Sequence, residues 1–417
     1  MNFKNFSIIL ALFSFELKVF SQPVNDVAPQ KELSSVEILD SEISTGELSN
    51  LEISDSEILN ILDDNDSDSG SDSEDTSDLP CSDIKECVDW MKENSGAFEV
   101  YNITNEVIDY LYLQYQDEEK VNKLKQDFKA IDYGMMVDVG DHKMSVNIKG
   151  EENDKTIVLL PASGVPSPIL FYNNFTDYLA NDFKVVTIEP FGYGVSDLTE
   201  EKRTAENIVS EIHECLQELE IDQFYFMGHS IGGMFSLAYD NTYEDEVLGF
   251  IGLDNTPNNH VFNSTAYSGD FTTFAKVFDY YHLWGLLPEN QKKQFLEIGE
   301  AEQQFLNFSE EEKKDWLSIT SYRNGNVNMI DEQNCFMDTL AYTDGMYFHC
   351  PMLMFTSEET QKVEKEWNTL HENMIKNNPE KELIDKSNVM PLEGTYHVFI
   401  HNQKKDVILD EIKKWIN

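Results

Sequence analysis

The chain of 417 residues carries 78 Asp and Glu against 30 Lys and Arg, which gives a formal net charge of −48 at pH 7. Phosphate backbones and anionic lipid surfaces repel such a chain, so the charge argues against a nucleic-acid partner and against attachment to an anionic membrane. The length accommodates one α/β domain of about 200–250 residues with additions.

Residues 1–21 have the pattern of a secretory signal peptide. Lys4 precedes an apolar run from Phe6 to Phe15, and the small residue Ser21 marks a cleavage site before Gln22. The run is too short to cross a bilayer as a helix, and no later segment is long and apolar enough to anchor the chain. We therefore expect a secreted, extracellular protein with no stable membrane anchor.

Residues 22–80 consist almost entirely of Ser, Asp and Glu with scattered Leu and Ile. Such a composition buries too little apolar surface to offset the entropy of ordering the chain. We predict a disordered acidic tail here.

Residues 81–132 carry apolar side chains at helical spacing, among them Val107, Leu111 and Val121. This spacing predicts a helical N-terminal extension, which we expect to pack on the main domain. Cys81 and Cys87 lie at its start and are candidates for a disulfide in an oxidising compartment.

Strands and helices then alternate in two core segments, 133–257 and 350–417. Strands are expected at 135–139, 144–148, 156–160, 184–188, 224–227, 247–253, 351–355 and 388–391, and helices at 169–179, 204–219, 231–238 and 407–416. This alternation predicts an α/β protein whose mostly parallel, doubly wound sheet is covered by helices on both faces.

The alternation stops at 258–349, where an aromatic, helix-prone insert runs through Phe278, Trp284 and Trp316. A structureless loop of this length is implausible in a compact domain, so we predict a helical cap inserted before the penultimate strand. Its position places it above the carboxyl edge of the sheet, where ligands bind in open α/β folds. Near its end, Cys335 and Cys350 are a second candidate disulfide pair, whereas Cys215 has the setting of a buried free thiol.

The motif G-x-S-x-G at Gly228 to Gly232 places Ser230 between the apolar run 224–227 and a helical segment. A strand–turn–helix context with glycines on both sides exposes a serine hydroxyl on a tight turn. Because serine is a weak nucleophile without a nearby base, the motif predicts a nucleophile that needs partners from elsewhere in the chain.

Three ordered landmarks resemble the α/β-hydrolase superfamily, over about Gly134 to Asn417. They are Leu159 to Gly164 after a strand, Glu189 to Asp197 after the next, and the elbow at Ser230. The second is similar to the superfamily segment D-x-x-G-x-G-x-S, with Glu in the first place. The resemblance implies an α/β-hydrolase fold with a cap and a serine hydrolase activity.

The resemblance also implies where a tetrahedral oxyanion would be held. One donor is the backbone N–H of the residue after the nucleophile, which is Ile231 here, and the second comes from the loop after the third strand, expected at 156–160. This chain has Pro161-Ala162 where a His-Gly pair is usual, so Ser163 takes the second role by position.

The catalytic base is expected after the last strand, in the chain order Ser, acid, His. His397 in Gly394-Thr395-Tyr396-His397 fits this position, and His401 is the alternative, although it falls where the final helix should begin. We expect the side chain of His229, next to the serine, to point away from the reactive face.

Two positions compete for the acid. Superfamily enzymes usually carry it after the strand at 351–355, where the chain offers Glu358 and Glu359 while the most typical position holds Thr360. Some members place it after the preceding strand, where Asp254 follows an apolar run. Either carboxylate would fix the tautomer of His397 and stabilise its imidazolium form, and Asp254 is favoured because it requires no loop shift.

The sequence therefore predicts a secreted serine hydrolase that cleaves small carboxylic esters with an apolar moiety and needs no cofactor or metal. Amidase or peptidase chemistry uses the same residues and is an alternative. A non-catalytic binding protein that keeps the fold is the rival hypothesis, and the joint presence of Ser230, His397 and the elbow glycines argues against it.

Overall fold

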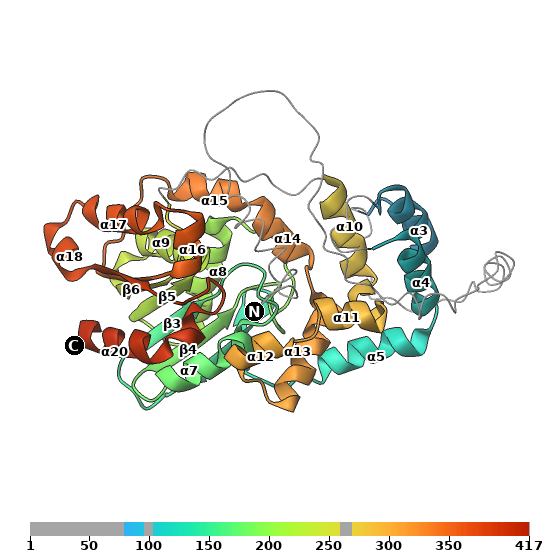
Figure 1. Cartoon of the computed structure of the whole chain (residues 1–417), viewed down its shortest axis with the longest axis horizontal. Helices are drawn as coiled ribbons and strands as arrows, with labels where there is room; N and C mark the ends of the chain where they lie inside the picture. The colour runs from blue at the N-terminus through green and yellow to red at the C-terminus, as the bar shows by residue number, and fades with distance from the viewer. Residues whose placement is uncertain (1–78, 96–102, 259–268, 417) are drawn as a thin grey trace, which may run out of the picture. The chain divides into compact units, whose positions relative to one another are not determined.

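The computed structural model describes residues 79–95, 103–258 and 269–416, so the predicted signal peptide and nearly all of the acidic tail lie outside the described residues. An eight-stranded sheet with the order β1-β2-β4-β3-β5-β6-β7-β8 forms the core (Figure 1). Its strands are β1 (Met135–Val139), β2 (His142–Lys149), β3 (Thr156–Leu160), β4 (Lys184–Glu189), β5 (Phe224–His229), β6 (Val247–Leu253), β7 (Met352–Ser357) and β8 (Asn388–Leu392).

The antiparallel pairs are β1 with β2 and β2 with β4, and the other neighbouring strands pair in parallel. The predicted mostly parallel sheet is thus confirmed. Side chains alternate between its faces, as β3 illustrates: Ile157 and Leu159 enter one apolar cluster, whereas Val158 and Leu160 enter another. Both faces are therefore buried, which explains why these strands are nearly continuous apolar runs.

Helices cover both faces of the sheet (Figure 1). One apolar cluster contains residues of α8 (Ala205–Glu218), α9 (Gly232–Thr242) and α17 (Trp367–Lys376). The opposite cluster contains residues of α6 (Pro168–Phe171), α7 (Asn173–Leu179), α19 (Ile400–Gln403) and α20 (Lys405–Ile416). Shorter elements complete the connections: η3 (Glu244–Glu246), α16 (Glu358–Val363) and α18 (Lys381–Lys386).

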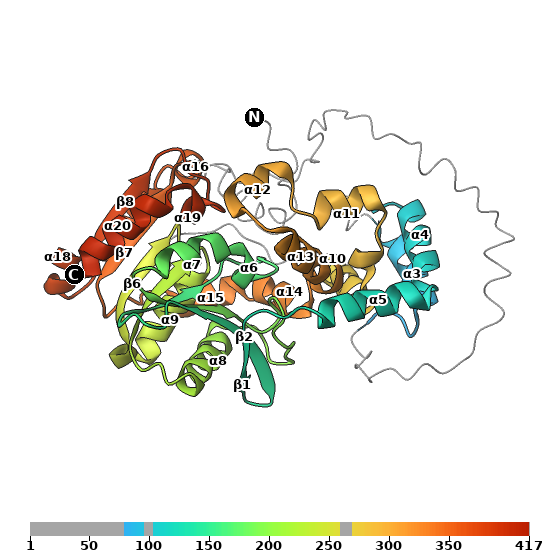
Figure 2. The same ribbon diagram turned by 90° about the horizontal axis from the view of Figure 1, so that it is seen from below.

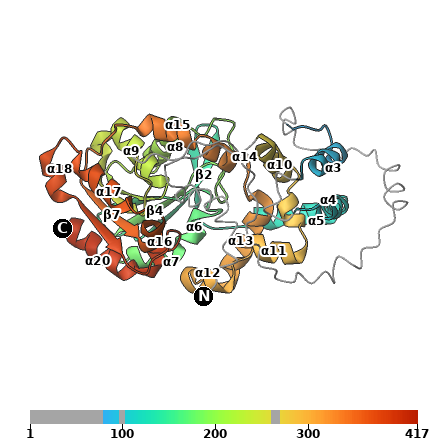
Figure 3. The ribbon, with the colours of Figure 1, turned by 45° about the horizontal axis from the view of Figure 1, so that its top comes forward.

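The insert between β6 and β7 is a helical cap, as predicted (Figure 3). Its elements are α10 (Gly269–Tyr280), η4 (Leu283–Leu286), α11 (Glu289–Phe295), α12 (Glu300–Leu306), α13 (Glu310–Arg323), α14 (Val327–Asn334) and α15 (Phe336–Thr343). Trp316 of α13 is buried and donates its indole N–H to Leu296 O at 3.1 Å, which ties α13 to the chain after α11.

The N-terminal extension forms α3 (Ile84–Glu93), α4 (Asn105–Tyr115) and α5 (Glu118–Lys129), and it packs on the cap instead of on the sheet (Figure 2). Leu111 and Ile108 share an apolar cluster with Phe278 and Trp284 of the cap. Phe128 stacks on Tyr322 of α13 with ring centroids 4.7 Å apart. The expected packing on the main domain is therefore replaced by packing on the cap, where the extension contributes to the burial of aromatic side chains such as Phe278 and Trp284.

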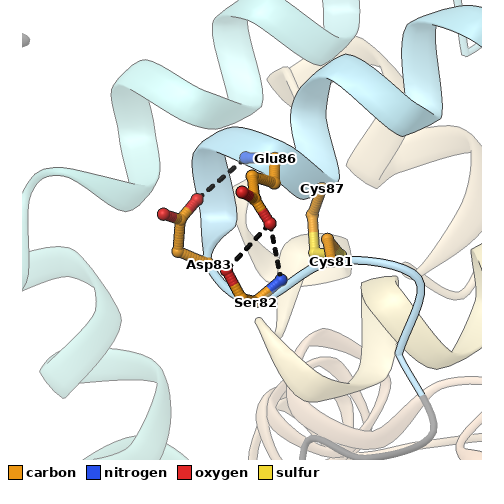
Figure 4. Close-up of a disulfide and its surroundings, with 5 residues drawn as sticks. All are labelled: Cys81, Ser82, Asp83, Glu86 and Cys87. Carbon is orange, nitrogen blue, oxygen red and sulfur yellow. Dashed lines mark hydrogen bonds between the residues drawn. A yellow bond between two sulfur atoms is a disulfide. The ribbon is translucent and has the colours of Figure 1, made fainter.

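A disulfide joins Cys81 to Cys87 at the start of the extension, with a Cα–Cα distance of 5.1 Å (Figure 4). The turn between them is also held by Glu86, whose carboxylate accepts hydrogen bonds from Ser82 N and Ser82 Oγ at 3.0 and 2.8 Å. Asp83 caps α3 by accepting from Glu86 N at 2.8 Å.

The other three cysteines of the chain are buried and free. Cys215 is a free thiol, as expected. The second candidate pair, Cys335 and Cys350, is not a disulfide. Cys335 contacts Asp331 at 3.9 Å, whereas Cys350 lies in the apolar cluster that contains residues of α8 and α9.

Candidate active site

Ser230 lies on a sharp turn between β5 and α9. Its φ is +52°, a left-handed conformation that is strained for a residue with a Cβ atom. The flanking glycines are needed for space: a Cβ on Gly228 would lie 2.7 Å from Gly233 N, and one on Gly232 would lie 2.7 Å from Leu160 O. This is the strained strand–turn–helix geometry of a nucleophile elbow.

Backbone hydrogen bonds fix the turn from the neighbouring strand. Ser230 N donates to Leu253 O at 3.3 Å, and Ser230 O accepts from Thr256 N at 2.9 Å. The end of β6 and the residues after it therefore hold the serine in place.

His397 and Asp254 meet at the carboxyl edge of the sheet. His397 Nδ1 lies 2.7 Å from Asp254 Oδ2, and both side chains are buried. With Asp254 ionised, this contact requires the proton on Nδ1 and leaves Nε2 as the basic atom of a neutral ring. The structure thus brings together two of the predicted site residues that are 143 positions apart in the sequence.

The Asp254 carboxylate accepts five hydrogen bonds. Oδ1 accepts from Ser357 N at 2.8 Å and Trp367 Nε1 at 2.7 Å, and Oδ2 accepts from His397 Nδ1 at 2.7 Å, Ser357 Oγ at 2.7 Å and Thr360 Oγ1 at 2.6 Å. Burial acts to raise the pKa of Asp254, but the contacts with His397 and Thr360 outweigh it and hold that pKa well below its usual range. The carboxylate is therefore ionised at neutral pH.

Glu358, the alternative acid, points elsewhere. Its carboxylate forms an ion pair with Lys362 and accepts from Gly394 N at 2.5 Å, and the pair with Lys362 lowers its pKa. Glu359 accepts from the backbone N–H of His397 at 3.0 Å. Both glutamates therefore support the loop that carries His397. Of the three candidate acids, Asp254 is the one that contacts the imidazole ring.

Two tyrosines flank the predicted oxyanion loop. Ala162 N donates to Tyr172 OH and Gly164 N donates to Tyr193 OH, each at 3.2 Å. Between them, the N–H of Ser163 has no acceptor among the hydrogen bonds of the described residues, and the same holds for the N–H of Ile231. Both predicted donors are thus uncommitted within the described part of the chain, as an oxyanion hole requires.

The remaining histidines near the elbow are structural. His229 Nδ1 lies 2.7 Å from Tyr172 OH, and Nε2 lies 3.0 Å from the backbone oxygen of His397. Both ring nitrogens of His229 therefore have structural partners. His401 is buried against Phe171 and Tyr172, and burial lowers its pKa to about 3. A ring with this pKa and these apolar neighbours is a poor candidate for the base.

Sequence reasoning missed four of the five donors to Asp254, namely Ser357 N, Ser357 Oγ, Thr360 Oγ1 and Trp367 Nε1. It did note Thr360 at the most typical acid position, and this polar residue was the available signal for a side chain that contacts the acid. It also gave no role to Glu332 of the cap, whose carboxylate accepts from Ser163 Oγ at 2.7 Å.

Two further kinds of feature are absent from the described segments, residues 79–95, 103–258 and 269–416. No group of three or more His, Cys, Asp or Glu side chains in these segments is arranged to hold a metal ion. None of their helices combines the length and the apolar character needed to cross a membrane.

Comparison with known families agrees with this architecture. Residues 156–368, just over half of the chain, match the family model described as the alpha/beta hydrolase fold. The chain therefore belongs to the α/β-hydrolase family and is a hydrolase of this fold.

Individual relatives are more distant. A probable proline iminopeptidase of Leptolyngbya boryana is 29% identical over 120 residues, which span 28% of this chain and 37% of that protein. A crystal structure of a VrEH2 variant with SNO is 15% identical, covers 68% of this chain and 98% of its own, and has a TM-score of 0.51. A meta-cleavage product hydrolase variant from Pseudomonas fluorescens is 16% identical over 68% of this chain and 97% of its own, with a TM-score of 0.47.

Proposed function

We propose that the protein is a serine hydrolase that cleaves carboxylic esters through an acyl-enzyme. The observation that carries this proposal is the 2.7 Å contact between His397 Nδ1 and Asp254 Oδ2 at the sheet edge that also bears the strained elbow of Ser230. Ser230, Asp254 and His397 follow β5, β6 and β8, in the chain order nucleophile, acid and histidine that is typical of the superfamily.

In the proposed reaction, Ser230 Oγ attacks the ester carbonyl carbon while His397 Nε2 accepts the serine proton. The carbonyl oxygen becomes an oxyanion that receives hydrogen bonds from Ile231 N and Ser163 N. The tetrahedral intermediate collapses, the C–O bond to the alcohol breaks, and the alcohol leaves with the proton from His397. A water molecule then repeats these steps to release the carboxylic acid and regenerate Ser230.

Asp254 orients the imidazole and stabilises its cationic form without taking its proton. Its pKa, which the surrounding donors hold below the usual range, suits that task because an acid this strong stays ionised beside an imidazolium. The five hydrogen bonds also fix the carboxylate in one rotamer.

We propose ester substrates with an apolar moiety on the basis of the cap composition. Several cap aromatics, including Phe278 and Trp284, are however used in the apolar cluster with the N-terminal extension. The cap aromatics alone thus do not define the length of the preferred acyl group. It is measured as the rate of hydrolysis of p-nitrophenyl esters of increasing chain length by the wild type and by Ser230→Ala. The proposal predicts release of p-nitrophenol that depends on Ser230, and equal rates for both proteins would contradict it.

Hydrolysis of N-terminal imino-acid amides is a second candidate, favoured by the similarity to a probable proline iminopeptidase over 120 residues. The same triad cleaves amides when the leaving amine is protonated by the histidine. Comparing kcat/KM for proline p-nitroanilide with that for p-nitrophenyl acetate separates the two. A higher value for the anilide would replace the esterase proposal by a peptidase one.

We further propose that the protein is secreted. The Cys81–Cys87 disulfide supports an oxidising compartment, because such bonds are rare where thiols are kept reduced (Figure 4). Expression of the full chain in a secreting cell should yield a protein in the medium that begins at Gln22. Retention in the cell with an intact Met1 would contradict secretion.

A further inference from the structure

The cap places a buried carboxylate against the oxyanion loop. Glu332 lies on α14 and is only 3% exposed. Its Oε1 accepts from Ser163 Oγ and from Tyr193 OH, both at 2.7 Å, and the neighbouring Gln333 also donates to Ser163 Oγ. Two residues of one cap helix therefore hold the side chain of the residue whose N–H is a predicted oxyanion donor.

The same carboxylate acts on the next residue through Tyr193. Tyr193 OH donates to Glu332 and accepts from Gly164 N at 3.2 Å, so the position of this hydroxyl depends on both contacts. On the other side of Ser163, Tyr172 OH accepts from Ala162 N. Hydrogen bonds therefore fix the loop on both sides of the Ser163 N–H. On the Gly164 side, the tyrosine that accepts the hydrogen bond is itself held by Glu332 of the cap.

A carboxylate that is buried this deeply is costly unless it is hydrogen-bonded or paired with a cation. Burial raises the pKa of Glu332, and the hydrogen bonds from Ser163 and Tyr193 oppose this effect. Arg203, whose charge also acts to lower the pKa of Glu332, forms a two-pronged ion pair with Glu211 at 2.6 and 2.8 Å. Glu332 is thus kept in place chiefly by the two hydroxyl donors, which is the arrangement expected of an acceptor that organises a loop.

We infer that Glu332 is a positioning residue: it couples the docked cap to the oxyanion loop by fixing Ser163 and Tyr193, so that the Ser163 N–H points at the reacting carbonyl oxygen. The inference rests on the proposed acyl-transfer function. It assigns the cap a part in transition-state stabilisation in addition to covering the site.

Three variants of the full chain test this inference. Glu332→Leu removes the acceptor at similar volume, and Glu332→Gln keeps an oxygen that can accept from both hydroxyls. Asn328→Ala is the matched control, because Asn328 also joins α14 to the core through Thr199 N at 3.0 Å and Thr199 O at 2.7 Å without touching Ser163. Two readouts are needed: kcat and KM for p-nitrophenyl butyrate, and hydrogen–deuterium exchange of the peptide spanning 159–166.

For Glu332→Leu we expect kcat to fall about 10- to 100-fold with little change in KM, because the lost interaction acts in the transition state. Exchange in 159–166 should be about tenfold faster in this variant. Glu332→Gln and Asn328→Ala should both stay within about threefold of the wild type in kcat.

If Glu332→Leu keeps the kcat and the exchange rate of the wild type, the inference is overturned. It is also overturned if Asn328→Ala loses as much kcat as Glu332→Leu. Faster exchange in Glu332→Leu together with an inactive wild type would leave the positioning role intact and contradict the proposed function instead. The exchange readout therefore separates the two failures.

Discussion

Thr360 Oγ1 donates a 2.6 Å hydrogen bond to Asp254 Oδ2. Thr360 follows β7, at the position where the superfamily most often has its acid, and Asp254 follows β6. Because β6 and β7 are parallel neighbours with Leu253 opposite Phe355, both positions lie at the same sheet edge, where Asp254 contacts His397. The proposed acid, Asp254, lies one strand away, and the usual acid position supplies a hydroxyl that donates a hydrogen bond to it.

The first prediction concerns the identity of the acid. Asp254→Asn keeps the shape of the side chain and tolerates its φ of +46°, but it removes the charge that stabilises the imidazolium. We expect kcat to fall by about 10² to 10⁴ in Asp254→Asn. The matched variant Glu358→Gln should stay within about threefold, since it loses the exposed ion pair with Lys362 but keeps an oxygen that can accept from Gly394 N. Equal losses in the two variants would show that the acid has been assigned wrongly.

The second prediction concerns Thr360. Thr360→Val has nearly the same volume and removes one of the five donors to Asp254, so the freer carboxylate should orient His397 less well. A hydrogen bond to a charged group is worth about 1.5–3 kcal/mol, which corresponds to a loss of about 10-fold or more in kcat if it acts through His397. Thr360→Ser keeps the hydroxyl and should restore most of the rate. Identical kinetics for the valine and serine variants would contradict this role.

The third prediction is a pH dependence of stability that arises away from the site, at Asp240 of α9. Its carboxylate accepts from His349 N at 2.6 Å, and burial raises its pKa to about 6. The pKa in an unfolded chain is about 3.9, so the folded protein binds this proton more tightly. The contribution of Asp240 to the free energy of unfolding is therefore greatest below pH 4 and falls as pH rises to about 6, by about 3 kcal/mol in total.

Urea unfolding of the wild type and Asp240→Asn from pH 4 to pH 7 measures this contribution. The free energy of unfolding of the wild type should fall relative to that of the variant as pH rises from about 4 to about 6. Above about pH 6, the difference between the two proteins should stay constant. A constant difference between the two proteins at all pH values would show that the carboxyl is not perturbed.

The fourth prediction concerns the disulfide of the N-terminal extension. Replacing Cys81 and Cys87 by serine opens a short loop, for which the chain-entropy model gives a loss of about 2 kcal/mol. Because α3 packs in the same apolar cluster as the cap, we expect the loss as a lower Tm with little change in KM. Thermal unfolding with and without reductant tests this on the wild type, and the double-serine variant should be insensitive to the reductant. An unchanged Tm on reduction would contradict it.

The apolar runs and their alternation with helical segments were enough to predict the eight strands and the cap, since the central strands β3, β5, β6 and β7 are largely apolar and buried. It was not enough to choose between Asp254 and Glu358, because both follow strands that end at one edge, and the choice depends on where each side chain points. Glu332 was out of reach for a different reason: its contact with Ser163 joins residues 169 positions apart through the docking of the cap. No local pattern encodes such a contact.

The central claim is that Ser230 is an activated nucleophile, and labelling with a fluorophosphonate probe tests it most directly. The probe forms a covalent bond only with a serine whose proton is removed by a nearby base. The account predicts a single modification at Ser230 in the folded wild type, abolished in Ser230→Ala and strongly slowed in His397→Ala. A folded wild type that does not react, or labelling that persists in Ser230→Ala, would contradict it and favour a non-catalytic binding protein with this fold.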